Sequence, residues 1–211
     1  MKMKTKAIAT ILAVISAVTL LAQDNKKPAG GSKEPAMQMP TPAPEMTRLI
    51  RQMAGTWSVT EKAFPSPMMP KGGTGKGAAT FTPGPGNRSL VEKYRSTGIM
   101  PGSFNAWGVF WWDAKAQVYR GTWCDSMTPG GCDTSGTTKW EGANLVGTME
   151  GDMNGQKMVS RFTYSDWKPN SFLLTMESGP DANSLQKVMT FTYSKGATQA
   201  AMEKPASKAS P

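Results

Sequence analysis

The 211-residue sequence contains no histidine and only two cysteines, and these absences exclude several kinds of active site. Without histidine there is no Ser-His-Asp or Cys-His catalytic system, no His-bound zinc or haem, and no imidazole general base. Two cysteines are too few for a four-thiolate zinc site or an iron–sulfur cluster. We therefore predict that the protein has no metal and no cofactor, and that it is not an enzyme.

Basic residues and methionine are abundant, but their distribution does not favour the binding functions that they often serve. There are 24 basic and 15 acidic residues, and no basic cluster exceeds two neighbours, so we expect no nucleic-acid partner. The 16 methionines could supply soft thioether ligands for Cu(I). Since methionine is the usual gap-filler of apolar interiors, we assign them to packing instead.

The N-terminus has the pattern of a secretory signal peptide. Lys2, Lys4 and Lys6 precede an uncharged apolar run from Ala7 to Leu21. That run is about 15 residues long, which suits a signal peptide and is short of the ~20 residues that span a bilayer. We predict a signal peptide over residues 1–22 with cleavage after Ala22, no transmembrane span in the mature protein, and a secreted or periplasmic location.

Two further segments have the composition of disordered chain. Residues 23–45 and 196–211 are rich in Pro, Ala, Lys and Gly and have no apolar periodicity. Such segments bury too little apolar surface to offset the entropy of ordering. The folded domain is accordingly predicted to span residues 46–195.

Within this domain the pattern predicts an all-β fold. One short helix is expected at Glu45–Ala54, where apolar residues recur at helical spacing and Gly55 follows. About ten short strands come after it, separated by turn residues every 8–14 positions. A meander of this kind closes most readily into a single antiparallel up-and-down barrel, which also removes exposed sheet edges. The expected strands are Thr56–Ala63, Gly75–Thr82, Ser89–Thr97, Phe104–Trp112, Gln117–Cys124, Thr137–Glu141, Leu145–Glu150, Lys157–Tyr164, Ser171–Ser178 and Lys187–Tyr193.

Four segments carry a resemblance to a known group of barrels. They are Leu49–Trp57, which is a short helix leading into a Gly-x-Trp strand, Leu90–Tyr94, Tyr119–Met127 and Lys187–Lys195. The first resembles the opening of the calycins, and together the four resemble the bacterial domain-of-unknown-function family 1579 of lipocalin-like barrels. The resemblance implies a lipocalin-like barrel over residues 46–195, and it implies no catalytic residues.

The two cysteines, Cys124 and Cys132, enclose seven residues at the expected end of a hairpin. In an oxidising compartment this spacing favours a structural disulfide. A redox-active dithiol is the alternative, but the pair lacks the C-x-x-C spacing of such sites.

Aromatic residues suggest two different binding functions. A small apolar or amphipathic ligand could lie inside the barrel, and small barrels either hold one such ligand or are filled by side chains. Alternatively the core is filled and the aromatic segment 104–112, apolar on both faces, is an outward surface for protein interaction or self-association. The predicted ligand-binding residues are Trp57, Trp107, Phe162, Tyr164, Phe172 and Phe191.

An enzyme that uses a carboxylate is the third hypothesis. No pair of acidic residues has a spacing that implies catalysis. Asp125 is the candidate because it follows Trp123 in one of the family-like segments. The structural alternative is that Asp125 caps the turn over residues 126–131 through its side-chain oxygens.

Overall fold

The computed structural model describes residues 40–66, 69–134, 136–153 and 156–195. The predicted signal peptide, residues 23–39 of the predicted linker and the predicted tail at 196–211 lie outside the described residues. Among the described residues, no helix has the length and apolar character needed to cross a membrane.

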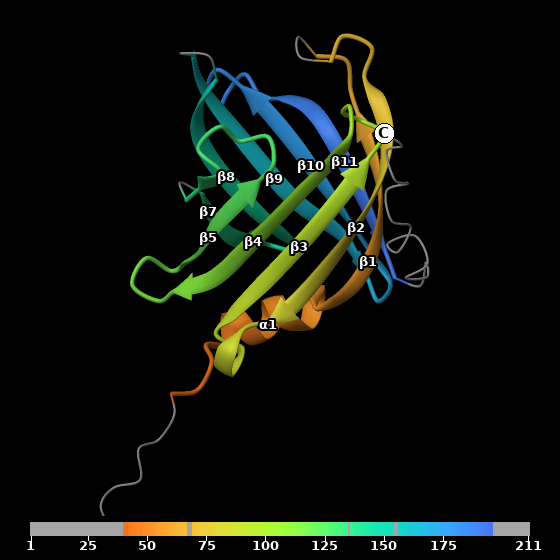
Figure 1. Cartoon of the computed structure of the whole chain (residues 1–211). Coiled ribbons are helices and arrows are strands. Elements are labelled where there is room, and N and C mark those ends of the chain that lie inside the picture. Colours follow the sequence, from red (N-terminus) through yellow and green to blue (C-terminus); the bar gives the residue numbers. More distant parts are fainter. Residues whose placement is uncertain (1–39, 67–68, 135, 154–155, 196–211) are drawn as a thin grey trace, which may run out of the picture. The chain divides into compact units, whose positions relative to one another are not determined.

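The strands form one closed antiparallel barrel, preceded by helix α1 (Figure 1). Neighbouring strands follow chain order from β1 to β4 and from β7 to β11, and β1 pairs with β11. Pairing of β4 with β5 closes the sheet on itself. The elements are α1 (Pro44–Met53), β1 (Gly55–Ala63), β2 (Gly73–Pro83), β3 (Ser89–Thr97), β4 (Ser103–Asp113), β5 (Val118–Asp125), β6 (Cys132–Asp133), β7 (Thr137–Glu141), β8 (Asn144–Met153), β9 (Gln156–Lys168), β10 (Ser171–Gly179) and β11 (Gln186–Ser194).

The predicted fold class is confirmed, and the differences from the prediction are local. Each expected strand is present, and a two-residue strand, β6, is added where the cysteines pair. Strand β9 continues to Lys168, beyond the predicted end at Tyr164. The helix begins at Pro44, one residue before its predicted start, because proline suits the first turn of a helix, where its missing N–H is not needed.

Helix α1 closes one end of the barrel. Its apolar side chains Met46, Leu49 and Met53 recur at helical spacing and are buried. Gly55, with a φ of 125°, makes the corner between the helix and β1. The Trp57 indole then reaches back and donates a hydrogen bond of 2.7 Å to the Met53 carbonyl, which fixes the helix against the barrel.

A layer of aromatic rings lies beneath the helix. Trp57 meets Phe172 edge-on with ring centroids 4.8 Å apart, and Phe172 stacks on Tyr193 at 4.3 Å. Tyr119 is also buried here, and its hydroxyl donates to the Glu45 carbonyl of the helix at 2.8 Å. These contacts fill the helix end of the barrel with packed rings.

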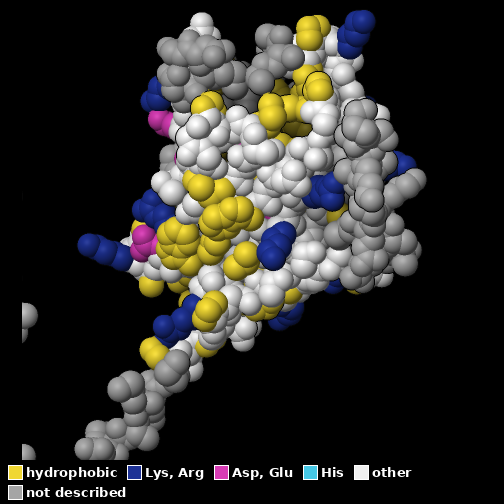
Figure 2. Space-filling view, viewed as in Figure 1, with side chains coloured by type: hydrophobic (Ala, Val, Ile, Leu, Met, Phe, Trp, Pro, Cys, Tyr) yellow, Lys and Arg dark blue, Asp and Glu magenta, His cyan; other side chains and the backbone are white. Residues whose placement is uncertain are grey.

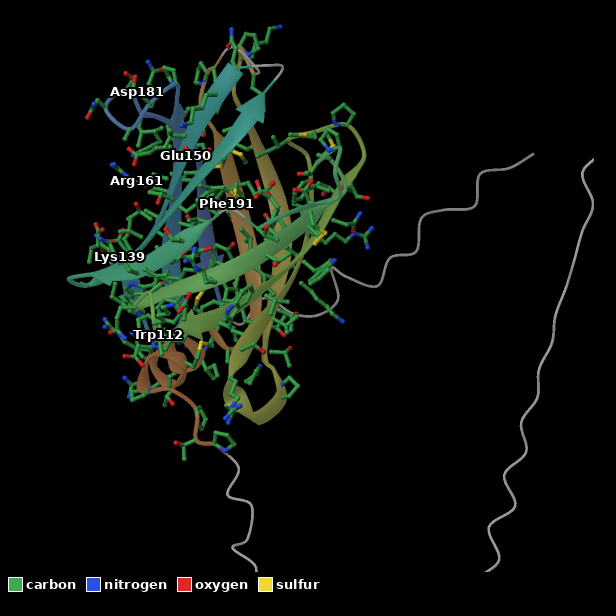
Figure 3. The ribbon with its side chains drawn as sticks, turned by 90° about the vertical axis from the view of Figure 1, so that its left-hand side faces the viewer. Trp112, Lys139, Glu150, Arg161, Asp181 and Phe191 are labelled. Atoms are coloured by element: carbon green, nitrogen blue, oxygen red, sulfur yellow. A yellow bond between two sulfur atoms is a disulfide. The ribbon has the colours of Figure 1, made fainter. Side chains whose placement is uncertain are left out.

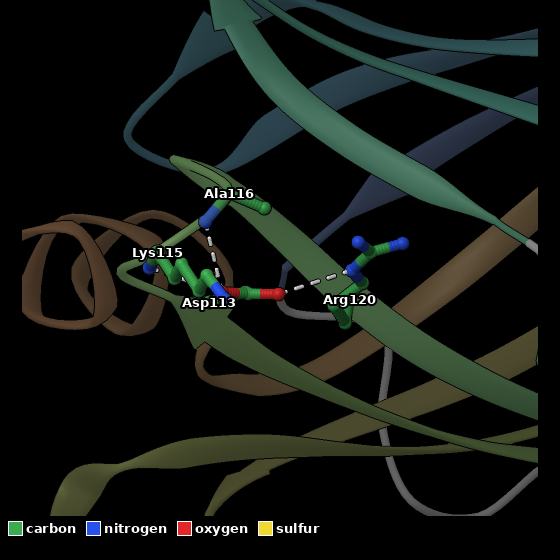
Figure 4. Close-up of polar contacts among 4 residues, drawn as sticks. All are labelled: Asp113, Lys115, Ala116 and Arg120. Atoms are coloured by element: carbon green, nitrogen blue, oxygen red, sulfur yellow. Dashed lines mark hydrogen bonds and ion pairs between the residues drawn. The ribbon is translucent and has the colours of Figure 1, made fainter.

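The turn between β4 and β5 shows how a short polar segment sets the strand register at this closed end (Figure 4). The backbone N–H groups of Lys115 and Ala116 each donate to Asp113 at 3.0 Å, and Arg120 donates to the same carboxylate at 3.3 Å. The backbone hydrogen bond from Ala116 is the main cause that lowers the pKa of Asp113.

The predicted disulfide between Cys124 and Cys132 is present. It joins β5 to β6, which pair through Cys124 with Cys132 and Trp123 with Asp133. The disulfide therefore holds the short β6 and the intervening loop against the rim of the barrel.

We predict that the double variant Cys124→Ser/Cys132→Ser is about 2–3 kcal/mol less stable than the wild type, because the closed loop no longer restricts the unfolded chain. Urea unfolding measures the difference. As the matched control, reducing agent should destabilise the wild type by a similar amount and leave the double variant unchanged. Equal stability of all four samples would contradict a structural role for the disulfide.

Candidate functional site: a cavity inside the barrel

The barrel encloses a cavity of about 370 Å³, at the lower end of the range typical of small-molecule sites. It lies beyond the aromatic layer and extends to the end of the barrel opposite α1. The interpretation that the barrel core is filled is therefore wrong. Its walls come mainly from β3, β4, β5, β8, β9, β10 and β11, and its apolar lining includes Ile99, Met100, Phe104, Phe110, Trp123, Met149, Phe162, Leu174, Met176, Met189 and Phe191.

Three of the six residues predicted to contact a ligand line this cavity: Phe162, Tyr164 and Phe191. Figure 3 shows Phe191 amid the strands of the barrel, whereas Trp112 lies near α1. Trp57 and Phe172 are buried, but they belong to the aromatic layer that closes the helix end. The strand alternation placed these two side chains inside correctly, but it could not show how far along the barrel axis the helix fills the interior.

Trp107 was predicted among the ligand-binding residues, and this placement is wrong. Its side chain is 47% exposed on the outside of β4 and is not part of the cavity wall. Inward positions on β4 are the even ones, with Phe104 and Phe110 in the cavity wall. The period of two therefore puts Trp107 on the opposite face, a conclusion that the sequence alone could have given.

The outward face of β4 carries exposed aromatic side chains, as the sequence indicated for segment 104–112. Trp111 is 39% exposed, and Val109 lies between it and Trp107 on the same face. Figure 2 shows hydrophobic side chains gathered on the side of the molecule where β3 and β4 lie. Lys93 and Arg120 are the strand partners of Trp107 and Trp111, so the patch has basic neighbours.

Two buried carboxyl groups line the cavity, and sequence reasoning assigned neither of them to the site. Glu61 on β1 is only 2% exposed, and its Oε1 accepts a hydrogen bond from the Tyr94 hydroxyl. Its other oxygen, Oε2, is buried without a hydrogen-bond partner among the described residues. The sequence does indicate that Glu61 faces inward, since it has the same strand parity as the buried Trp57 and Val59.

Glycines on β2 make the room for this pair. A side chain at Gly75 would collide with the Glu61 carboxyl, and a Cβ at Gly77 would lie 2.8 Å from the Tyr94 hydroxyl oxygen. Strand β2 lies between β1, which carries Glu61, and β3, which carries Tyr94, and Gly75 pairs directly with Glu61. The inward face of β2 is thus a recess that fits the Glu61 carboxyl and the Tyr94 hydroxyl.

Glu92 lies deeper, toward the closed end. Its strand partner Phe81 pairs with Gly55 at the start of β1. Burial raises the pKa of the Glu92 carboxyl from 4.5 to about 8. Burial likewise raises the pKa of Tyr164 and of Tyr193, and the charge of the nearby Glu92 raises both further. The floor of the cavity therefore contains a carboxyl group that is protonated at neutral pH.

Asp125 lies at the open end, where it acts as a turn cap. Its Oδ1 accepts hydrogen bonds from the backbone N–H groups of Met127 and Thr128, both at 2.7 Å. Its Oδ2 accepts from the Trp123 indole at 3.1 Å and from the Thr128 hydroxyl at 2.9 Å. The structural interpretation of Asp125 is confirmed, since both oxygens are engaged in holding the turn.

Four acidic residues line the cavity. They are Glu61, Glu92, Asp125 and Asp133, and no described lysine or arginine joins them. Over the described part of the chain, no group of three or more His, Cys, Asp or Glu residues is arranged to hold a metal ion.

Residues 42–195 match the family model described as "Protein of unknown function (DUF1579)". The chain belongs to this family. The match spans the whole described barrel, so the resemblance seen in the sequence is confirmed. No curated protein matches this DUF1579 sequence.

Several solved structures resemble this DUF1579 barrel. The S-type phycobiliprotein lyase CPES from Guillardia theta is 7% identical, with a TM-score of 0.51 over 72% of this chain and 93% of its own. At this identity the likeness establishes the fold alone. Rv2717c from M. tuberculosis is 10% identical, with a TM-score of 0.42 over 74% and 99%. A designed fluorescence-activating β-barrel is 10% identical, with a TM-score of 0.38 over 69% and 94%.

The raised pKa of Glu92 predicts a pH-dependent stability. An unfolded glutamate has a pKa near 4.5, so between that pH and 8 the folded protein keeps a proton that the unfolded chain has lost. Stability should consequently fall as the pH rises through this window. Relative to Glu92→Gln, the wild type should lose about 3 kcal/mol of unfolding free energy between pH 5 and pH 8.

Urea unfolding at a series of pH values measures the difference in unfolding free energy between the wild type and Glu92→Gln. The other titrating groups are the same in both proteins, so their contributions cancel in this difference. Glu141→Gln is the matched control, because Glu141 is exposed and forms a surface ion pair with Lys139 at 3.3 Å. The control should follow the wild type at every pH. A Glu92→Gln curve parallel to the wild type would contradict the assignment.

Proposed function

We propose that this protein binds a small, mainly apolar molecule in the barrel cavity. The observation that carries the proposal is the cavity itself, of about 370 Å³ and lined mainly by aromatic and aliphatic side chains. Enclosed apolar pockets with a few polar groups are typical of small-molecule sites. Here the carboxyl groups lie at identifiable places, at Glu61, Glu92, Asp125 and Asp133.

The arrangement of the two ends supports a single entrance. At the helix end, Trp57 and the α1 side chains Met46, Leu49 and Met53 are buried and occupy the interior. The rim at the other end includes Ile99 and Met100, which are apolar side chains between β3 and β4. Burial of apolar ligand surface supplies about 25 cal/mol per Å². Because this contribution depends on the buried area and not on specific polar contacts, we expect the cavity to bind apolar molecules of varied structure.

Filling the cavity should abolish binding. Met176 points inward from β10, opposite Met189 on β11, and both line the cavity. We expect Met176→Trp to weaken binding of the neutral fluorescent probe N-phenyl-1-naphthylamine at least tenfold, because the indole would occupy ligand space. Fluorescence titration of the full chain measures the affinity.

Thr175→Trp is the matched control, since it adds the same ring on the adjacent, outward-facing position of β10. The control should bind the probe as the wild type does. Failure of the wild type to bind the probe, or equal binding by Met176→Trp, would refute the proposed function. Near-ultraviolet circular dichroism confirms that each variant retains its folded core.

We further infer that the protein works outside the cytoplasm. The support is the signal-like N-terminal sequence together with the disulfide, which forms and persists in oxidising compartments. No role for the outward aromatic face of β4 is needed for this function, and the structure assigns no partner to that face.

The export hypothesis makes a prediction of its own. When the full chain is expressed in a bacterium, protein recovered from the periplasm should begin at Gln23, and its intact mass should be two hydrogens below the reduced value. Mass spectrometry before and after reduction measures both. Recovery of the uncleaved, reduced chain from the cytoplasm alone would contradict export.

A further inference from the structure

The sign of the charge inside the barrel restricts which ligand can enter. Four acidic residues line the cavity, of which Glu92 is kept protonated at neutral pH by burial, and no basic residue among the described lining joins them. A carboxylate headgroup, as in a fatty acid anion, would enter this low-dielectric interior without a cationic partner among the described lining residues, which is unfavourable. A positively charged or hydrogen-bond-donating headgroup is favoured by the same argument.

Glu61 provides a specific acceptor for such a group. Its carboxyl is 2% exposed and lies against the cavity, with Oε1 occupied by the Tyr94 hydroxyl. The second oxygen, Oε2, is buried and has no hydrogen-bond donor among the described residues. A buried acceptor without a donor is destabilising, so a donor supplied by a ligand would be stabilising.

The surroundings of this oxygen are shaped for recognition. Gly75 leaves the space that the carboxyl occupies, because any side chain there would collide with it. Aromatic rings stand on the adjoining walls: Tyr94 meets Phe104 at 6.1 Å and Phe191 at 6.4 Å between ring centroids, both edge-on. A carboxylate beside aromatic faces is the combination that binds an ammonium group, through an ion pair and cation–π attraction.

We propose that the natural ligand is a cationic amphiphile, with an apolar body held by the barrel and a protonated amine bound to the Glu61 carboxyl. The proposal rests on the function proposed above. Tyr94 acts as a positioning residue, because its hydroxyl holds the carboxyl in place while its ring forms part of the wall. Glu92 lies deeper in the cavity and does not contact the amine in this proposal.

Displacement of N-phenyl-1-naphthylamine by three matched amphiphiles tests the proposal. Decylamine, decan-1-ol and decanoate share an apolar chain and differ in the headgroup charge at pH 7. We expect decylamine to displace the probe from the wild type at a concentration at least tenfold lower than either of the others. Equal potency of decylamine and decan-1-ol, or a preference for decanoate, would overturn the proposal without any need for a variant.

Two variants assign the preference to a residue. Glu61→Gln keeps an oxygen that accepts from Tyr94, and in this variant decylamine should lose its tenfold advantage over decan-1-ol in displacing the probe. Glu141→Gln removes the same charge from the exposed surface and should retain that advantage. If Glu61→Gln keeps the preference, the assignment is overturned. A probe that does not bind the wild type at all instead refutes the proposed function, so the two failures are distinguishable.

Discussion

Pairing of β4 with β5 is the constraint on which the rest of the structure depends. The ladder runs from Ala106 and Asp125 to Asp113 and Val118, and it joins two strands that would otherwise leave an open sheet. Closure creates an interior, and with it a distinction between the side chains that face a cavity and those that face solvent. The neighbouring β5–β7 contact consists of only Tyr119 with Thr138 and Arg120 with Thr137, so β4 supplies most of the pairing that holds β5 in the wall.

The two ends of the closed barrel are built differently, and this difference turns the interior into a binding site. At one end α1, Trp57 and the aromatic layer around Phe172 fill the space with close ring contacts. At the other end the wall consists of rim loops and the Asp125-capped turn, held by the Cys124–Cys132 disulfide. Stability is therefore concentrated at the helix end, and the cavity occupies the part of the barrel that the aromatic layer leaves empty.

Within that cavity, the buried carboxyls oppose stability and favour recognition. Burial disfavours the ionised form of Glu92, and an acceptor oxygen of Glu61 has no donor from the described chain. Apolar residues at both positions would pack without this cost. Retaining acids there is consistent with a ligand that supplies the missing donor, and the glycines at 75 and 77 keep the space that this arrangement requires.

The local features could be predicted from the sequence, since each depends on residues close together in the chain: the helix at α1, the strands, the turn cap at Asp125 and the cysteine pairing. Strand parity also carried the information that Trp107 faces outward and Glu61 inward, although only the structure made it evident. The position of each inward side chain along the barrel axis, in contrast, depends on the tertiary structure. Whether Phe172 or Phe191 meets a ligand depends on how far α1 fills the interior and on the stagger between distant strands, and neither is set by contacts local in sequence.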